Sequence, residues 1–213
     1  MPDRALEPSS DCPHCPRLAA FRGTWRSNEP GWFNAPVPGF GPNDARLLIV
    51  GLAPGLRGAN RTGRPFTGDY AGDLLYETLL DFDFARGVYA ERADDGLSLV
   101  DCRIVNAVRC VPPENKPIGE EIARCRPFLA STIATMPRLT AILALGKIAH
   151  DSVVTTLGGK PSRITFRHAG RHPIAGVTLF GSYHCSRYNT NTGRLTPAMF
   201  REVFADIRAF IPA

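Results

Sequence analysis

Four of the six cysteines in this sequence are spaced like the ligands of a metal centre. Cys12 and Cys15 form a C-x-x-C pair, whose two-residue gap lets both thiolates bind one centre from a single turn. Cys110 and Cys125 lie on either side of a proline-rich stretch at residues 111–113. The set fits a four-thiolate site for zinc or for a 4Fe-4S cluster, because thiolate spacing alone does not separate the two. A redox C-x-x-C and buried free cysteines without a function are the alternatives.

The other two cysteines have different surroundings. Cys102 lies inside an apolar stretch, where a free cysteine is most often a small core residue. Cys185 directly follows His184, and such a pair suggests a thiol nucleophile with its base. Adjacent residues on an extended strand point to opposite faces, so His184 is poorly placed to activate Cys185. We therefore do not expect nucleophilic catalysis by Cys185.

Polar residues gather in three segments that each follow an apolar stretch, at residues 51–72, 106–117 and 184–194. The apolar stretches predict strands at residues 46–54, 102–108, 140–146 and 177–183. Helical spacing predicts helices at residues 73–80, at about 119–135 and from residue 147. This alternation indicates a single α/β domain over residues 1–213, with a mostly parallel sheet covered on both faces and an N-terminal arm at residues 1–45. Ligands bind such sheets at the carboxyl ends of the strands, so the three polar segments are the candidate site.

Composition limits the class of protein. The apolar share of 44% and the charged share of 21% are ordinary for a folded chain. Lys and Arg number 25 against 20 Asp and Glu, a formal charge of +5 that mildly favours polyanionic partners. No apolar stretch is long enough to span a membrane, and the N-terminus lacks the apolar run of a signal peptide. We therefore expect a cytoplasmic protein whose cysteines stay reduced.

The three polar segments carry a specific family resemblance. The sequence GLAPGLRGANRTGRPFTGD at residues 51–69, the first signature segment, resembles the first signature of the family 5 (type B) uracil-DNA glycosylases. The sequence HCSRYNTNTGRLT at residues 184–196, the second signature segment, resembles their second signature, and NAVRCVPP at residues 106–113 resembles the strand end between them. The resemblance runs from about Cys12 to Arg201.

The resemblance implies a fold, a cofactor and a reaction. The fold is a three-layer α/β/α sandwich with a central four-stranded, mostly parallel sheet. The cofactor implied by the resemblance is a structural 4Fe-4S cluster rather than zinc. Its implied ligands are Cys12, Cys15, Cys110 and Cys125. The reaction is hydrolysis of the N-glycosidic bond of uracil in DNA, and by the breadth of the family of hypoxanthine and other deaminated bases, leaving an abasic site. The partner is damaged DNA, and we expect a monomer on the bacterial or archaeal nucleoid. A catalytically weak lesion-binding Fe–S protein is the alternative, and a redox carrier is a more distant one.

The resemblance also implies roles in holding the base. Phe66 is the stacking face for the flipped base, and the backbone amides of Gly51, Leu52 and Ala53 meet its carbonyl groups. Asn106 presents a donor and an acceptor that match N3–H and O4 of uracil.

Catalysis and DNA contact are assigned in the same way. His184 donates to O2 as negative charge develops on the leaving base. Asp69 orients the attacking water, with Asp73 as second choice because Asp73 has the alternative role of a helix N-cap. Contacts to DNA are assigned to Ser186, Arg187, Tyr188 and Asn189, and contacts to phosphates to Arg61, Arg64, Arg187 and Arg194. One departure stands out, because the family usually has proline where this chain has Cys185. Loss of the proline removes a restraint on φ and predicts a looser loop.

Overall fold

The computed structural model describes residues 5–212 and is built around one sheet. Its five strands lie in the order β4-β1-β5-β7-β6. The strands are β1 (Leu47–Gly51), β4 (Cys102–Asn106), β5 (Ala141–Leu145), β7 (Val177–Ser182) and β6 (Arg171–Ile174). The first four are mutually parallel, as predicted, and β6 is antiparallel to β7.

The expectation of four strands is therefore corrected to five. Strand β6 was missed because Pro173 and an alternation of exposed and half-buried residues argue against a buried strand. Proline is tolerated at a sheet edge, where its lack of an N–H costs no ladder bond. Ala175 and Gly176 both have positive φ, 47° and 83°, and make the tight turn that returns the chain into β7.

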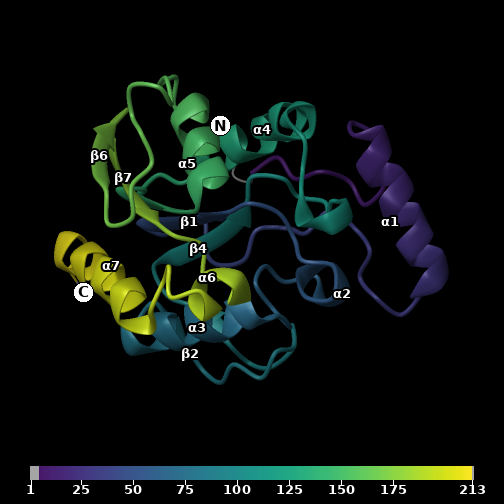
Figure 1. Ribbon diagram of the computed structural model, residues 1–213, viewed down its shortest axis with the longest axis horizontal. Coiled ribbons are helices and arrows are strands. Elements are labelled where there is room, and N and C mark those ends of the chain that lie inside the picture. The colour runs from purple at the N-terminus through teal and green to yellow at the C-terminus, as the bar shows by residue number, and fades with distance from the viewer. Residues whose placement is uncertain (1–4, 213) are drawn as a thin grey trace.

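Two helical layers cover the sheet (Figure 1). Helices α3 (Tyr70–Asp81) and α7 (Pro197–Phe210) lie on one face, and α4 (Gly119–Ala134) and α5 (Lys147–Thr156) lie on the other. Because side chains alternate along a strand, Leu47 and Ile49 join the core under α3 and α7, whereas Leu48 and Val50 join the core under α4 and α5. This confirms the three-layer α/β/α fold and explains why the strands are continuously apolar.

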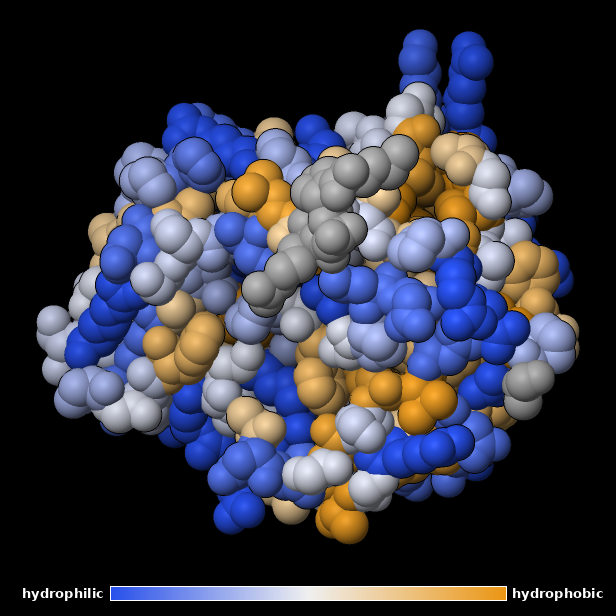
Figure 2. All heavy atoms as spheres, turned by 180° about the vertical axis from the view of Figure 1, so that it is seen from behind, coloured by the Kyte–Doolittle hydropathy of each residue, from blue (hydrophilic) through white to orange (hydrophobic). Residues whose placement is uncertain are grey.

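The remaining elements lie around this sandwich. Helix α1 (Pro16–Asn28) stands at one side of the molecule and buries only Leu18 and Arg22. The short elements are α2 (Ala59–Thr62), β2 (Ala85–Arg86), β3 (Ser98–Leu99), the 3-10 turn η1 (Pro113–Asn115) and α6 (Arg187–Asn191). From behind, apolar residues form separate patches between hydrophilic ones (Figure 2). Among the described residues no helix is both long and apolar enough to cross a membrane.

Candidate active site

A cavity of about 480 Å³ opens at the carboxyl edge of the sheet, and its walls come from all three polar segments. The first signature segment and the start of α3 supply Leu52, Ala53, Pro54, Gly55, Ala59, Phe66, Asp69, Tyr70 and Ala71. The segments after β4 and β7 supply Asn106, Asn115, His184, Ser186 and Arg187. The fold thus brings together residues that are more than 130 positions apart in the chain, since Leu52 and His184 share one wall.

Gly51 and Asn106 are neighbours at this edge because they are paired in the β1–β4 register. A Cβ atom on Gly51 would lie 2.4 Å from Asn106 Oδ1 and 2.6 Å from the ring of Phe66. Glycine is therefore required so that both side chains can approach the strand end. Asn106 is only 2% exposed. Its Oδ1 has no hydrogen-bond partner within residues 5–212, an unusual state for a buried amide that marks it as a group kept for a ligand.

Phe66 is held in an unusual backbone conformation beside Asn106. Its φ is 53°, a left-handed value that costs a bulky residue energy and is typical of functional sites. The ring packs against His184, with centroids 5.8 Å apart and planes inclined by 29°. An aromatic face in a cavity wall is suited to stacking on a planar base.

His184 follows β7 and is a neutral imidazole at neutral pH. Burial lowers its pKa from 6.5 to about 4. Its Nδ1 is buried without a partner in the described part of the chain, whereas its backbone carbonyl accepts a 2.8 Å hydrogen bond from Asn189 Nδ2. The backbone at His184 is thus held by the loop, while the side chain lines the cavity without a hydrogen bond to Nδ1 from the described residues.

Asp69 supplies the carboxylate of the cavity. It is the N-cap of α3, and its Oδ1 accepts a 3.2 Å hydrogen bond from the Gly72 amide. A Cβ on Gly58 would lie 2.4 Å from Asp69 Oδ2, so glycine leaves room for this oxygen. Burial raises the pKa of Asp69, whereas the Gly72 bond opposes that rise. Asp73, the second choice for orienting water, is exposed and does not line the cavity. It lies in the first turn of α3, but the alternative role of N-cap belongs to Asp69, because α3 begins at Tyr70.

Comparison with known proteins places the chain in a family. A model described as the uracil DNA glycosylase superfamily matches residues 38–208. The chain belongs to the type-5 family of this superfamily. A type-5 uracil-DNA glycosylase of Thermus thermophilus is 43% identical, over 92% of this chain and 92% of its own length. Type-5 enzymes of Pyrobaculum aerophilum and Mycobacterium leprae are 38% and 41% identical, over 91% and 93% of this chain and 86% and 91% of their own lengths. The resemblance of the signature segments is confirmed.

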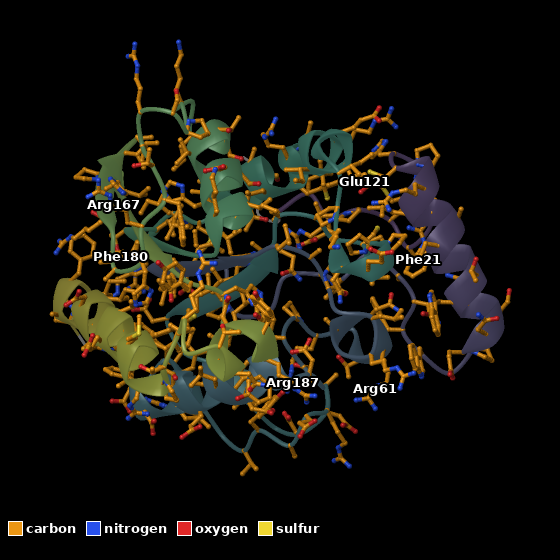
Figure 3. The ribbon with its side chains drawn as sticks, in the orientation of Figure 1. Phe21, Arg61, Glu121, Arg167, Phe180 and Arg187 are labelled. Carbon is orange, nitrogen blue, oxygen red and sulfur yellow. The ribbon has the colours of Figure 1, made fainter. Side chains whose placement is uncertain are left out.

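The second signature segment of this type-5 family member forms the rim of the cavity. Tyr188 is 73% exposed at the start of α6. Arg187 is exposed and lies 5.3 Å over the ring of Tyr70, and it points away from the sheet at the lower edge of Figure 3. Ser186 instead caps α6, accepting a 3.4 Å bond from the Asn189 amide. Arg187 and Tyr188 are therefore exposed, while the side chains of Ser186 and Asn189 are engaged within the loop.

The arginines assigned to phosphates have different positions. Arg61 and Arg194 are exposed; Arg61 is bonded to the Arg57 carbonyl, and Arg194 lies 4.6 Å over the ring of Tyr183. Arg64 is only 4% exposed and forms a two-point ion pair with Asp95 at 2.8 and 2.7 Å. The prediction that Arg64 meets a phosphate is wrong, because its guanidinium is already satisfied inside the protein.

Two further residues of the cavity were missed by sequence reasoning. Asn115 and Tyr70 line it, from the η1 turn and the start of α3. Asn115 and its neighbour Glu114 have positive φ, 57° and 55°, in a turn that returns the chain toward the cavity. Asn115 stands nine residues beyond Asn106, so no periodic signal connects it to a strand end. The positive φ would be suggested only weakly by the asparagine itself.

Cys185, the departure from the type-5 pattern, is fully buried and not at the cavity surface. Its thiol donates to the Ala71 carbonyl at 3.4 Å, while the preceding His184 lines the cavity. The two side chains thus point to different surroundings, as the strand geometry predicted. The looser loop predicted from the loss of proline stays a prediction; the structure adds a contact from Cys185 to α3.

The four cysteines of the predicted metal centre do come together. Cys12, Cys15, Cys110 and Cys125 line one small cavity between α1, α4 and the segment after β4. All four are free thiols, packed among Leu18, Val108 and Phe128. Four thiols that line one cavity are a donor set that either a 4Fe-4S cluster or a zinc ion takes.

Proposed function

We propose that this protein hydrolyses the N-glycosidic bond of uracil in DNA and leaves an abasic site, as a repair enzyme. The observation that carries the proposal is the convergence of an unpartnered Asn106 amide, the Phe66 ring, neutral His184 and the Asp69 carboxylate on one cavity. A base must leave the helical stack to enter this cavity, whose lining includes Ser186 and Arg187 of the second signature segment.

Recognition of the base is assigned to groups that contact its face and its edge. Phe66 stacks on the flipped base, and the Asn106 amide accepts from N3–H and donates to O4. Leu52 and Ala53 line the cavity directly after β1, where backbone amides can meet the carbonyl groups of the base. A site built to bond an edge rejects bases that lack the matching groups, because its own polar atoms are then left unpaired.

The chemical step is assigned to Asp69 and His184. As the C1′–N1 bond breaks, negative charge develops on the uracil ring and positive charge on the sugar. His184, being neutral, donates a hydrogen bond to O2 without competing for a proton, and this stabilises the departing anion. Asp69 orients a water molecule toward C1′ and stabilises the cationic sugar. The water forms the new bond to C1′ and gives its proton to the Asp69 carboxylate. The base leaves with the bonding electrons as an anion and takes up a proton from solvent after release.

We propose in addition that Cys12, Cys15, Cys110 and Cys125 hold a 4Fe-4S cluster. Their shared cavity and the C-x-x-C pair of Cys12 and Cys15 support this. The group would supply a cross-link between the N-terminal arm, α4 and the segment that carries Asn115. Purified Cys110→Ser protein should lack the iron content and visible absorbance of the wild type. Cys102→Ala, which removes a buried thiol elsewhere in the core, should keep both; loss of iron in neither or in both variants would contradict the assignment.

The test of the reaction uses end-labelled duplexes that carry U:G, U:A or hypoxanthine:T, followed by alkali to cleave abasic sites. We expect strand breaks at uracil from the wild type and a sharp decrease in Asp69→Ala and His184→Ala. Breaks at hypoxanthine would extend the substrate range to a purine. Intact DNA from iron-replete protein that still binds the uracil duplex would refute the enzyme and support a lesion-binding protein.

A further inference from the structure

The segment between α3 and β4, residues 82–101, makes an excursion whose role the reaction does not explain. It forms only the two short strands β2 and β3 and then returns to the sheet, and Figure 1 shows it at the lower edge of the molecule. Most of it is exposed, with Val88 at 67%. Two of its polar side chains nevertheless reach inward, Asp95 and Tyr89.

The Asp95 carboxylate belongs to a buried hydrogen-bond network in which each of its two oxygens has partners. Its side chain is 1% exposed and faces Arg64, which is 4% exposed, in a two-point ion pair. The same carboxylate accepts the amides of Ala90 and Leu97 at 2.9 and 3.1 Å, so the excursion itself is folded around it. These bonds hold the pKa of Asp95 well below its usual range, and the carboxylate is ionised at any physiological pH.

Arg64 is fixed along its whole length. Its Nε donates to Thr67 Oγ1 at 2.8 Å. Its guanidinium carbon lies 5.2, 5.3 and 5.8 Å from the ring centroids of Phe40, Tyr76 and Tyr89. Burial of such a cation is costly unless it is paired, so Asp95 keeps Arg64 in this position.

The network holds the backbone on both sides of Phe66. Before it, the Pro65 carbonyl accepts from the Tyr76 hydroxyl at 2.6 Å. At Phe66 itself the carbonyl accepts from the Tyr89 hydroxyl at 3.3 Å, and that hydroxyl also accepts from the Gly68 amide at 3.4 Å. These contacts hold Phe66 at its left-handed φ, a value that is otherwise unfavourable for a bulky residue.

We propose that Arg64 and Asp95 are positioning residues that, with Tyr76 and Tyr89, fix the ring of Phe66 at the depth and tilt at which it meets the base. The excursion at residues 82–101 is then a buttress of the base pocket. The inference rests on the proposed function, in which Phe66 stacks on the flipped base. Neither Arg64 nor Asp95 lines the cavity, so each acts through Phe66.

Neutralising the pair separates positioning from stability. In Arg64→Met/Asp95→Asn no charge is left buried without its partner. The amides of Ala90 and Leu97 bond different oxygens of Asp95 and asparagine keeps only one of these oxygens, so we expect a lower melting temperature in this variant as well. The Nε bond to Thr67 is lost. We expect single-turnover excision of uracil to slow by about 10–100-fold, since small misplacements of a reacting group have effects of this size. Affinity for uracil DNA should change less than about threefold, because the exposed arginines are intact.

The matched control is the ion pair of Arg46 and Asp101. It joins Arg46, just before β1, to Asp101, the last residue of the same excursion: the Arg46 backbone N–H donates to Asp101 Oδ1 at 2.8 Å, and Arg46 Nε donates to Oδ2 at 2.5 Å. The pair lies at the amino end of β1, and neither residue lines the cavity. Arg46→Met/Asp101→Asn should lower the melting temperature and leave the single-turnover rate unchanged. All rates are measured well below the melting temperature of each variant.

The outcomes distinguish a failure of the positioning role from a failure of the proposed stacking role of Phe66. A wild-type rate in folded Arg64→Met/Asp95→Asn, together with a slow Phe66→Ala variant, would overturn the positioning role alone. A wild-type rate in Phe66→Ala would remove the stacking role itself. Equal slowing in the neutralised pair and in the Arg46 control would show a general loss of stability and would also overturn the inference.

Discussion

The two signature segments differ in how they are held. In the first, Arg64 and Phe66 are buried and bonded to Asp95 and Tyr89, which lie outside the segment. In the second, Arg187 and Tyr188 are exposed on a helix of five residues whose hydrogen bonds stay largely within the loop. A rigid wall is needed where a base is recognised by its outline, whereas a surface that meets a deformable duplex needs reach and charge. Substitutions in the first segment should therefore change the rate of excision, and those of the exposed residues Arg187 and Tyr188 in the second should change DNA binding.

The largest effect should come from Asp69→Asn, which keeps the cap on α3 and removes the charge. We expect single-turnover excision to fall by about 10²–10³-fold, the size of a lost general base. Because burial raises the pKa of Asp69 in the folded state, its contribution to stability is greatest at low pH and is lost as the pH rises through that pKa. The variant should thus be at least as stable as the wild type at neutral pH, as measured by thermal unfolding.

Asp73→Asn is the control for this variant, since Asp73 is exposed one turn further along α3. It should excise uracil at nearly the wild-type rate. A slow Asp73→Asn with an active Asp69→Asn would exchange their roles.

Asn106→Ala should have the second-largest effect and lower the rate of single-turnover excision by about 10²-fold. The lost amide leaves both edge groups of uracil unpaired in a buried site, and such sites discriminate strongly. Asn34→Ala is the matched control, because Asn34 is also a buried amide but bonds the carbonyls of Trp25 and Glu29 at the end of α1. It should lower stability and leave the excision rate intact; comparable rates for the two variants would contradict recognition by Asn106.

The fold was largely predictable from sequence, and the site only in part. Strands buried on both faces give continuous apolar runs, so β1, β4, β5 and β7 were found, and polar residues at their ends pointed to Asn106 and His184. Burial of Arg64 was not predictable, since its partner Asp95 lies 31 residues away in an irregular segment. Sequence patterns report periodicity within one element, whereas these residues are set by tertiary pairing.

The change of the excision rate with pH should be intermediate in size. It distinguishes between the two titratable groups of the cavity, His184 and Asp69. His184, with a pKa of about 4, stays neutral above about pH 5, so no change of rate should appear near its ordinary pKa of about 6.5. The rate should instead decrease on the acid side as Asp69 is protonated, at a pH above the ordinary range of aspartate. Single-turnover rates across pH measure this. The acid limb should be absent in Asp69→Asn, and a limb near pH 6.5 that disappears in His184→Ala would contradict neutral His184.

The smallest effects should come from the second signature segment. Arg187→Ala should weaken binding of uracil duplexes by a few-fold and lower the slope of affinity against salt by about one, as expected for one lost phosphate contact. Tyr188→Ala should weaken binding by a similar amount without changing that slope, because its exposed ring carries no charge. Fluorescence anisotropy at several salt concentrations measures both, and single-turnover rates at saturating enzyme should stay within about threefold of the wild type. If Arg187→Ala slows the saturated rate as strongly as Asn106→Ala does, the rim also shapes the reacting geometry, and the division of labour between the two segments does not hold.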